Sequence, residues 1–246
     1  MSEPRMALQE LSTRGITTLE QFAASKARMR KPQRINSQKA LEEIVARAAA
    51  AAERPFRSQI GPPAASVALV LDGKRVDYAA IARLNGQPLD YVATTLKGGQ
   101  QALVAYSDRS VMRNLRLRQF KSTPRAINEE IDNALLAGGL QPSSATTADV
   151  ALGVRICEHH NFEGDSFTLA PNDYIDDLTE FDEGLDVFSG DWNDKISSLQ
   201  MGRCWCQVWE DVSQGGASIS FFEDKWELDS IGWNDRISCI WSPFRS

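Results

Sequence analysis

The chain has 246 residues, a formal net charge of −6 and 42% hydrophobic residues, which is ordinary for one or two folded domains. The charge is divided unevenly. Residues 1–150 carry 21 Lys or Arg against 14 Asp or Glu, whereas residues 151–246 carry 6 against 19. All six tryptophans, all four cysteines and both histidines also follow residue 150. The composition therefore predicts two segments of different chemistry.

Neither a membrane span nor a secretory signal is expected. No run of about 18 apolar residues occurs, and the first residues lack the basic region and apolar core of a signal peptide. We expect a cytoplasmic protein, with secretion by a signal-independent route left open. Cys204 and Cys206 form a C-x-C rather than the C-x-x-C of zinc ribbons or redox sites, so the interpretation we favour is buried thiols.

Residues 1–60 form a predicted helical, basic and partly flexible region. Ser37 is a good cap for a helix over residues 38–53, in which Leu41 and Ile44 follow helical spacing. The apolar stripe is thin and consists mostly of alanine, so we expect this helix to pack against a partner helix or to project from the core. Self-association or a protein partner for the N-terminal helices is therefore left open.

A basic run extends from Lys26 to Arg34 around Pro32. Such a run can contact nucleic acid, an anionic membrane or the acidic half of the chain itself. No aromatic residues interleave the cations as in single-strand binding surfaces. We therefore favour a solvated helix end and linker over nucleic acid.

Residues 61–139 read as a small α+β domain, and residues 140–150 as a linker. A strand ends at Asp72-Gly73, Asp77 caps a short helix, and two strands flank the turn at Lys97-Gly98-Gly99, followed by two helices. Residues 1–150 contain no histidine or cysteine, no glycine-rich phosphate loop and no nucleophile motif. We therefore predict that the protein is not an enzyme.

Residues 151–246 contain an internal repeat. Residues 156–166 align on 208–218 at an offset of 52, and residues 192–198 align on 233–239 at an offset of 41. Each copy reads as short strands separated by turns, and four short strands cannot bury a core alone. The two copies are thus predicted to pack as a two-sheet sandwich.

The repeated Asn-Asp-x-Ile-Ser turn offers carboxylate, amide, hydroxyl and carbonyl oxygens within a few residues. Hard oxygen ligands of this kind are those that calcium prefers. A single copy would be read as an Asx turn. Two copies at the same place in a repeat favour calcium.

These residues resemble the paired Greek-key motifs of a microbial-type βγ-crystallin domain, because each copy carries both the strand-turn glycine and the Asn-Asp turn. The resemblance implies an all-β Greek-key sandwich after the α+β region, with two calcium sites that each use oxygens from both copies. Lys195, Arg236, Glu158 and Glu210 are expected to contribute backbone oxygens. The expected ligand positions are Glu158, Asn193, Asp194, Lys195, Ser197, Glu210, Asn234, Asp235, Arg236 and Ser238.

Two departures bear on the affinity of these sites. Cys239 stands where the signature has its last Ser, a hydroxyl that we expect to brace the turn, so the second site is predicted to be weakened without being lost. Lys195 and Arg236 place a cation in each signature, and partly screened repulsion from these side chains would lower affinity.

The leading hypothesis is a non-enzymatic protein in which calcium stabilises the C-terminal domain by binding its folded form. One alternative is a peptidase-inhibitor-like or toxin-like effector that uses the same fold. Another is an assembly or nucleic-acid-binding module in residues 1–140 with an accessory calcium-binding domain.

Overall fold

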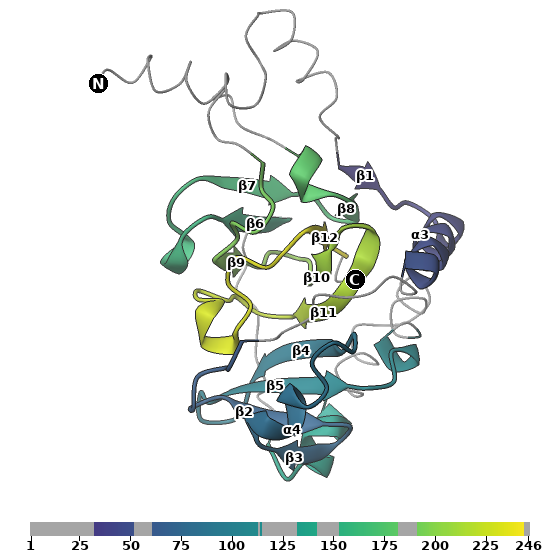
Figure 1. The fold of residues 1–246 in the computed structure, drawn as a ribbon. Coiled ribbons are helices and arrows are strands. Elements are labelled where there is room, and N and C mark those ends of the chain that lie inside the picture. The colour runs from purple at the N-terminus through teal and green to yellow at the C-terminus, as the bar shows by residue number, and fades with distance from the viewer. Residues whose placement is uncertain are drawn as a thin grey trace, which may run out of the picture.

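The computed structural model describes residues 32–51, 61–112 with 114, 132–141, 153–181 and 191–243. Strands predominate, in one sheet of nine strands and one of three (Figure 1). Most of the basic run and the linker at 142–150 lie outside the described residues. Across the described ranges, no helix is long and apolar enough to cross a membrane.

The first unit of the fold lies before the repeat and contains two antiparallel strand pairs, β2 with β3 and β4 with β5. Its elements are β2 (Ala68–Leu71), β3 (Lys74–Val76), α4 (Tyr78–Ala82), β4 (Asp90–Thr95) and β5 (Gln101–Tyr106). Strand β2 runs parallel to β5, whereas β4 and β5 are antiparallel. Positive φ angles of 48° at Asp72 and 75° at Gly73 form the predicted turn. The Asp77 carboxylate accepts a 2.8 Å hydrogen bond from the Ala80 N–H, as its predicted role as a helix cap requires.

The C-terminal unit consists of two copies of one strand pattern. The strands of the first copy are β6 (Val154–Cys157), β7 (Ser166–Leu169), β8 (Asp173–Ile175) and β9 (Ser198–Gln200). Those of the second are β10 (Cys206–Asp211), β11 (Gly215–Phe221) and β12 (Cys239–Trp241). Short 3₁₀ turns lie between them: η1 (His160–Phe162), η2 (Leu178–Glu180), η3 (Val212–Gln214) and η4 (Asp229–Ile231).

Each copy contributes its third strand position to the sheet of the other copy. That position is β8 in the first copy and the segment at Lys225 in the second. Strand β8 of the first copy pairs with β12 of the second. In return, Lys225 of the second copy bridges Leu199 in β9 of the first. Each sheet of the sandwich therefore contains backbone from both copies, which is the Greek-key arrangement predicted for this half of the chain. The four cysteines are free and buried, as expected of thiols.

The two halves of the chain share the nine-stranded sheet. Strand β4 of the first unit pairs in parallel with β11 of the second copy, with Asp90 opposite Ser218. Beside this junction, the Gly232 backbone has a φ of 73°, and a Cβ there would come within 2.5 Å of the Gly61 carbonyl oxygen. Glycine at position 232 therefore permits a close approach of the two units that other residues would obstruct.

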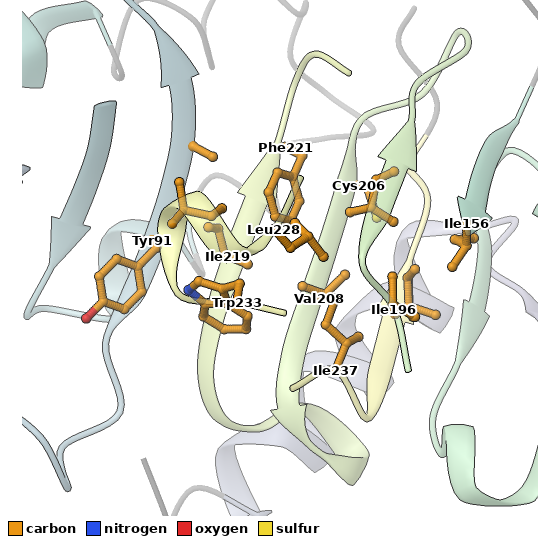
Figure 2. Packing of buried hydrophobic residues seen from close by; sticks show 14 of the residues in the cluster. Tyr91, Ile156, Ile196, Cys206, Val208, Ile219, Phe221, Leu228, Trp233 and Ile237 are labelled. Atoms are coloured by element: carbon orange, nitrogen blue, oxygen red, sulfur yellow. The ribbon is translucent and has the colours of Figure 1, made fainter. Parts of the chain in front are cut away.

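One core runs through the junction. Tyr91 of β4 meets Trp233 edge to face, with ring centroids 6.2 Å apart, and both side chains are almost completely buried. Figure 2 shows this pair in line with Ile219, Val208 and other apolar side chains of the second copy. Because these residues belong to one buried cluster, the two units exclude water from each other's sheets.

Helix α3 (Gln38–Ala51) lies on the C-terminal unit, beside its tryptophans (Figure 1). Ser37 accepts a hydrogen bond from the Ala40 N–H at 3.2 Å, as expected for its cap. Leu41 and Ile44 are buried in a cluster with Ile35, Tyr174, Trp205, Trp209, Cys239 and Trp241. The expectation that this helix packs on a partner helix or projects from the core is wrong. Large indole faces compensate for its thin apolar stripe.

The strand before this helix contains Arg34, the last cation of the basic run. Strand β1 (Gln33–Arg34) pairs with β8, and the Arg34 guanidinium lies 2.8 Å from the Asp173 carboxylate. The hydrogen bond to Asp173 raises the pKa of Arg34. At least this cation therefore contacts the acidic half of its own chain.

Candidate functional site

The two Asn-Asp turns have the same local geometry. Asp194 and Asp235 both adopt a left-handed φ of 53°, which Asp and Asn tolerate better than most residues. Each is hydrogen-bonded by the amide of the preceding residue: Asn193 and Asn234 donate from Nδ2 to the neighbouring carboxylate at 2.8 Å. The sequence repeat is therefore a structural repeat at this turn.

The turns reach reciprocally into each other's copy. The Asp194 N–H donates to the Ile237 carbonyl at 3.1 Å, and the Asp235 N–H donates to the Ile196 carbonyl at 3.3 Å. The buried Ser197 hydroxyl hydrogen-bonds the Asp235 carboxylate of the other copy. Oxygens from both copies therefore meet at one place.

The connection between the first two strands of each copy, β6 to β7 and β10 to β11, forms an arch. The contacts between this arch and the Asn-Asp turn follow the same pattern in both copies. The Ser197 N–H donates to the Cys157 carbonyl at 3.1 Å, and the Ser238 N–H donates to the Trp209 carbonyl at 3.0 Å. These contacts place Glu158 and Glu210, the residues that follow Cys157 and Trp209, beside the serines of the two signatures. Nearly equal positive φ angles recur at Gly164 and Gly216, 75° and 71°.

The pKa values of the two aspartates in the turns, Asp194 and Asp235, are both raised. Partial burial, followed by neighbouring Asp191, Asp235 and Asp211, raises the pKa of Asp194 despite its hydrogen bond from Asn193. Partial burial is also the main cause that raises the pKa of Asp235, with Asp229 and Glu158 adding to it. A bound cation would favour the charged form of both carboxylates.

Two further oxygens in these turns are unpartnered. Oδ1 of Asn193 and Oδ1 of Asn234 are buried with no hydrogen-bond partner among the described residues. Buried acceptors in this state are uncommon in folded proteins. Their occurrence at the same position in both copies indicates that the repeated turn suits an electropositive group.

The cationic side chain of the second signature is directed to other partners. Arg236 donates to the Glu210 carboxylate and, at 3.2 Å, to the Gly232 carbonyl, and it lies 5.9 Å from the Trp233 ring. The other Glu210 oxygen accepts from the Ala217 N–H at 3.1 Å. Both side chains are thus occupied, and binding of calcium by the backbone oxygens of Glu210 and Arg236 stays a prediction. Lys195 is half-buried in its turn.

The last position of each signature braces the arch. In the first copy, the Ser198 hydroxyl accepts from the Phe162 N–H at 3.1 Å and donates to the His159 carbonyl at 2.5 Å. In the second copy the Cys239 sulfur accepts from the Gln214 N–H. The sulfur therefore makes the same kind of backbone N–H contact as the serine, and it also donates to the Tyr174 hydroxyl at 3.5 Å.

Sequence reasoning overlooked the influence of Asp211 and Asp229 on these turns. Asp211 acts on Asp194, and Asp229 acts on Asp235. Neither residue lies in the Asn-Asp signature. Folding brings Asp211 near Asp194, whereas Asp229 lies in the same short segment as Asp235. The signals in the sequence were this closeness and the adjacency of Asp211 to Glu210.

Exchanged third strands, paired arch glycines and reciprocal Asn-Asp turns define residues 153–181 and 191–243 as a βγ-crystallin-like Greek-key domain. Solved structures similar to this part of the chain include one from work on the evolution of the eye-lens βγ-crystallin domain fold, at 25% identity, covering 41% of this chain and 94% of that one with a TM-score of 0.32. A βγ-crystallin domain from Flavobacterium johnsoniae is 28% identical, with coverages of 38% and 96% and a TM-score of 0.31. An archaeal βγ-crystallin is 25% identical, with coverages of 38% and 99% and a TM-score of 0.29.

No family model and no curated protein matches the chain.

Proposed function

We propose that the C-terminal domain is a non-enzymatic calcium-binding module with two sites, one at each end of the pair of reciprocal turns. The observation that carries the proposal is the reciprocal hydrogen bonding of Asp194 to Ile237 and of Asp235 to Ile196, together with the same unpartnered amide oxygen in both turns. Carboxylate, hydroxyl, amide and carbonyl oxygens form a ligand set that suits calcium.

Calcium would stabilise this domain in two ways. It would offset the repulsion among the carboxylates around Asp194 and Asp235, and it would bind the folded chain in preference to the unfolded one. Because each site uses both copies, occupancy would also tie the copies together. Since β11 pairs with β4, the stabilisation would extend to the first unit.

The proposal is tested by calorimetric titration of the full chain with Ca²⁺, and by thermal unfolding with Ca²⁺ and with EGTA. We expect two bound ions and a higher midpoint with Ca²⁺. Asp194→Ala and Asp235→Ala should each remove one ion, and the double variant should remove both. Asp165→Ala removes an exposed carboxylate outside the turns and serves as the control. Equal midpoints in Ca²⁺ and EGTA would overturn the proposal.

The contact between Arg34 and Asp173 supports the interpretation that the end of the basic run serves the chain itself. Contacts with a protein partner, nucleic acid or an anionic membrane stay predictions from the sequence. Salt-dependent binding of the full chain to DNA, RNA or anionic vesicles would test the latter two.

A further inference from the structure

Three metal-ligating side chains that are not among the predicted calcium ligands converge beside one arch. They are His160 in η1, Glu227 just before η4, and Asp229 at its start. His160 Nε2 lies 3.3 Å from Asp229 Oδ2, and one ligand atom from each of the three side chains lies within 4.8 Å of the others.

Backbone contacts fix the two segments that carry these residues. The Asn161 N–H donates to the Trp226 carbonyl at 2.8 Å, and the Leu228 N–H donates to the Ser197 carbonyl at 2.9 Å. The Ser230 hydroxyl donates to the Glu227 carbonyl at 3.1 Å. The main chain on either side of the cluster is therefore fixed by hydrogen bonds.

The other copy shows that the fold does not require this cluster. There the Ser213 N–H donates to the Asp176 carbonyl at 2.8 Å, and the Leu178 N–H donates to the Ser238 carbonyl at 2.9 Å. These equivalent bonds place Val212, Asp177 and Thr179 at the positions of His160, Glu227 and Asp229. Valine offers no ligand atom. The Asp177 carboxylate already accepts from the Thr179 N–H and hydroxyl, at 2.9 and 2.6 Å.

The donor set distinguishes this cluster from the calcium turns. Calcium takes oxygen ligands, whereas an imidazole nitrogen with two carboxylate oxygens suits a divalent transition ion such as Zn²⁺. With bonds of about 2.1 Å, two tetrahedral zinc ligands lie about 3.4 Å apart. The 3.3 Å between His160 and Asp229 fits that spacing.

We propose that His160, Glu227 and Asp229 form a binding site for a divalent transition metal ion, distinct from the two calcium turns. The His160 and Asp229 side chains are 41% and 55% exposed, so the ion can enter from solvent and retain water as its remaining ligand. The site lies beside Asp235, whose carboxylate is influenced by both His160 and Asp229. It therefore places a second kind of cation next to one calcium turn.

The test is a calorimetric titration of the full, reduced chain with Zn²⁺ in the presence of saturating Ca²⁺. We expect one zinc ion per chain and a dissociation constant that rises about tenfold or more in His160→Ala. His159→Ala is the matched control, because it removes the neighbouring, exposed histidine. Asp229→Asn and Glu227→Gln should also raise the dissociation constant for zinc.

A spectroscopic measurement supplies a second readout. Trp226 is 49% exposed and precedes Glu227, so Ni²⁺ bound at the cluster should quench part of the tryptophan emission. Trp226→Phe should abolish that part while leaving the zinc titration unchanged. Near-UV circular dichroism establishes that each variant is folded.

Equal zinc affinity in the wild-type chain and folded His160→Ala would overturn the proposal, as would an equal loss in His159→Ala. If His160→Ala weakened Ca²⁺ binding as much as Zn²⁺ binding, His160 would belong to the calcium site, and the proposal of a distinct site would fail. Because zinc is titrated over saturating Ca²⁺, failure of the zinc proposal leaves the calcium result intact.

Discussion

The Ser218 hydroxyl donates a 2.5 Å hydrogen bond to the Asp90 carboxylate across the junction of β11 and β4. Both residues are completely buried, and Arg109 approaches the same carboxylate at 3.4 Å. A charged group buried between two units is tolerated because partners from both units reach it. The contact therefore makes the stability of each half depend on the other.

Asp90→Ala should destabilise the C-terminal domain, although Asp90 lies outside it. Removing the carboxylate leaves Ser218 and Arg109 without their buried acceptor, which should cost about 3 kcal/mol. Urea unfolding followed by tryptophan fluorescence measures the effect, because every tryptophan lies after residue 150. The exposed Asp108, whose carboxylate accepts from the Ser110 N–H, is the control when changed to Ala. An unchanged tryptophan transition in Asp90→Ala would show that the halves unfold independently.

Lys225 should give the protein a specific pH dependence. Burial lowers its pKa from 10.5 to about 8, and its ammonium group contacts Gln101 of the first unit. Between about pH 8 and 10.5 the unfolded chain holds this proton and the folded chain does not, so stability rises with pH by up to about 1.4 kcal/mol per unit. Below about pH 8 both the folded and the unfolded chain hold this proton, so Lys225 no longer makes the free energy of unfolding depend on pH.

The measurement is the free energy of unfolding of the wild-type chain minus that of Lys225→Met, followed from pH 7 to 10.5. The difference removes the titration of the tyrosines and cysteines, which are present in both proteins. Lys97→Met, at an exposed turn, should produce no such trend. A flat difference for Lys225→Met would contradict the lowered pKa.

Cys239 should be replaceable by serine but not by alanine. Its sulfur accepts from the Gln214 N–H, as the Ser198 hydroxyl does from Phe162 in the other copy. Cys239→Ala removes that acceptor and opens a small cavity, at a cost of about 1–3 kcal/mol. Cys239→Ser should stay within about 1 kcal/mol of the wild type. Chemical denaturation of the three proteins compares them, and equal losses in both variants would contradict the bracing role.

Leu41→Ala should loosen helix α3 from the tryptophan face. Leu41 is completely buried against the cluster that contains Trp209 and Trp241, and truncation of such a leucine typically costs about 2–5 kcal/mol. The tryptophan emission should also shift to longer wavelength as water reaches these rings. Lys39→Ala, on the exposed face of the same helix, should change neither property.

Local features were predictable from the sequence because the residues that determine them are close together in the chain. The turn at Asp72-Gly73 follows from backbone preferences, and the cap at Asp77 from one local hydrogen bond. The Asn-Asp turns were found because they occur twice. Strand β3 was not predicted, since it has three residues and is mostly exposed, which leaves no apolar pattern to detect.

The partners of helix α3 and of the His160 cluster could not be predicted. Each depends on segments far apart in the sequence that meet only in the folded chain. The spacing of Leu41 and Ile44 predicts an apolar face but does not determine what covers it. In the same way, His160 is separated from Glu227 and Asp229 by most of the two repeats.

The charge division, the repeat and the two oxygen-rich turns were determined by the sequence itself. Only the tertiary structure decided that the acidic repeat and the basic half share a sheet. Strands β7 and β11 occupy the same position in the repeat, yet β7 alternates between exposed and buried residues and β11 is buried throughout. The physical reason is that β7 is an edge strand, whereas β4 pairs with β11, and no turn between β4 and β11 encodes that pairing.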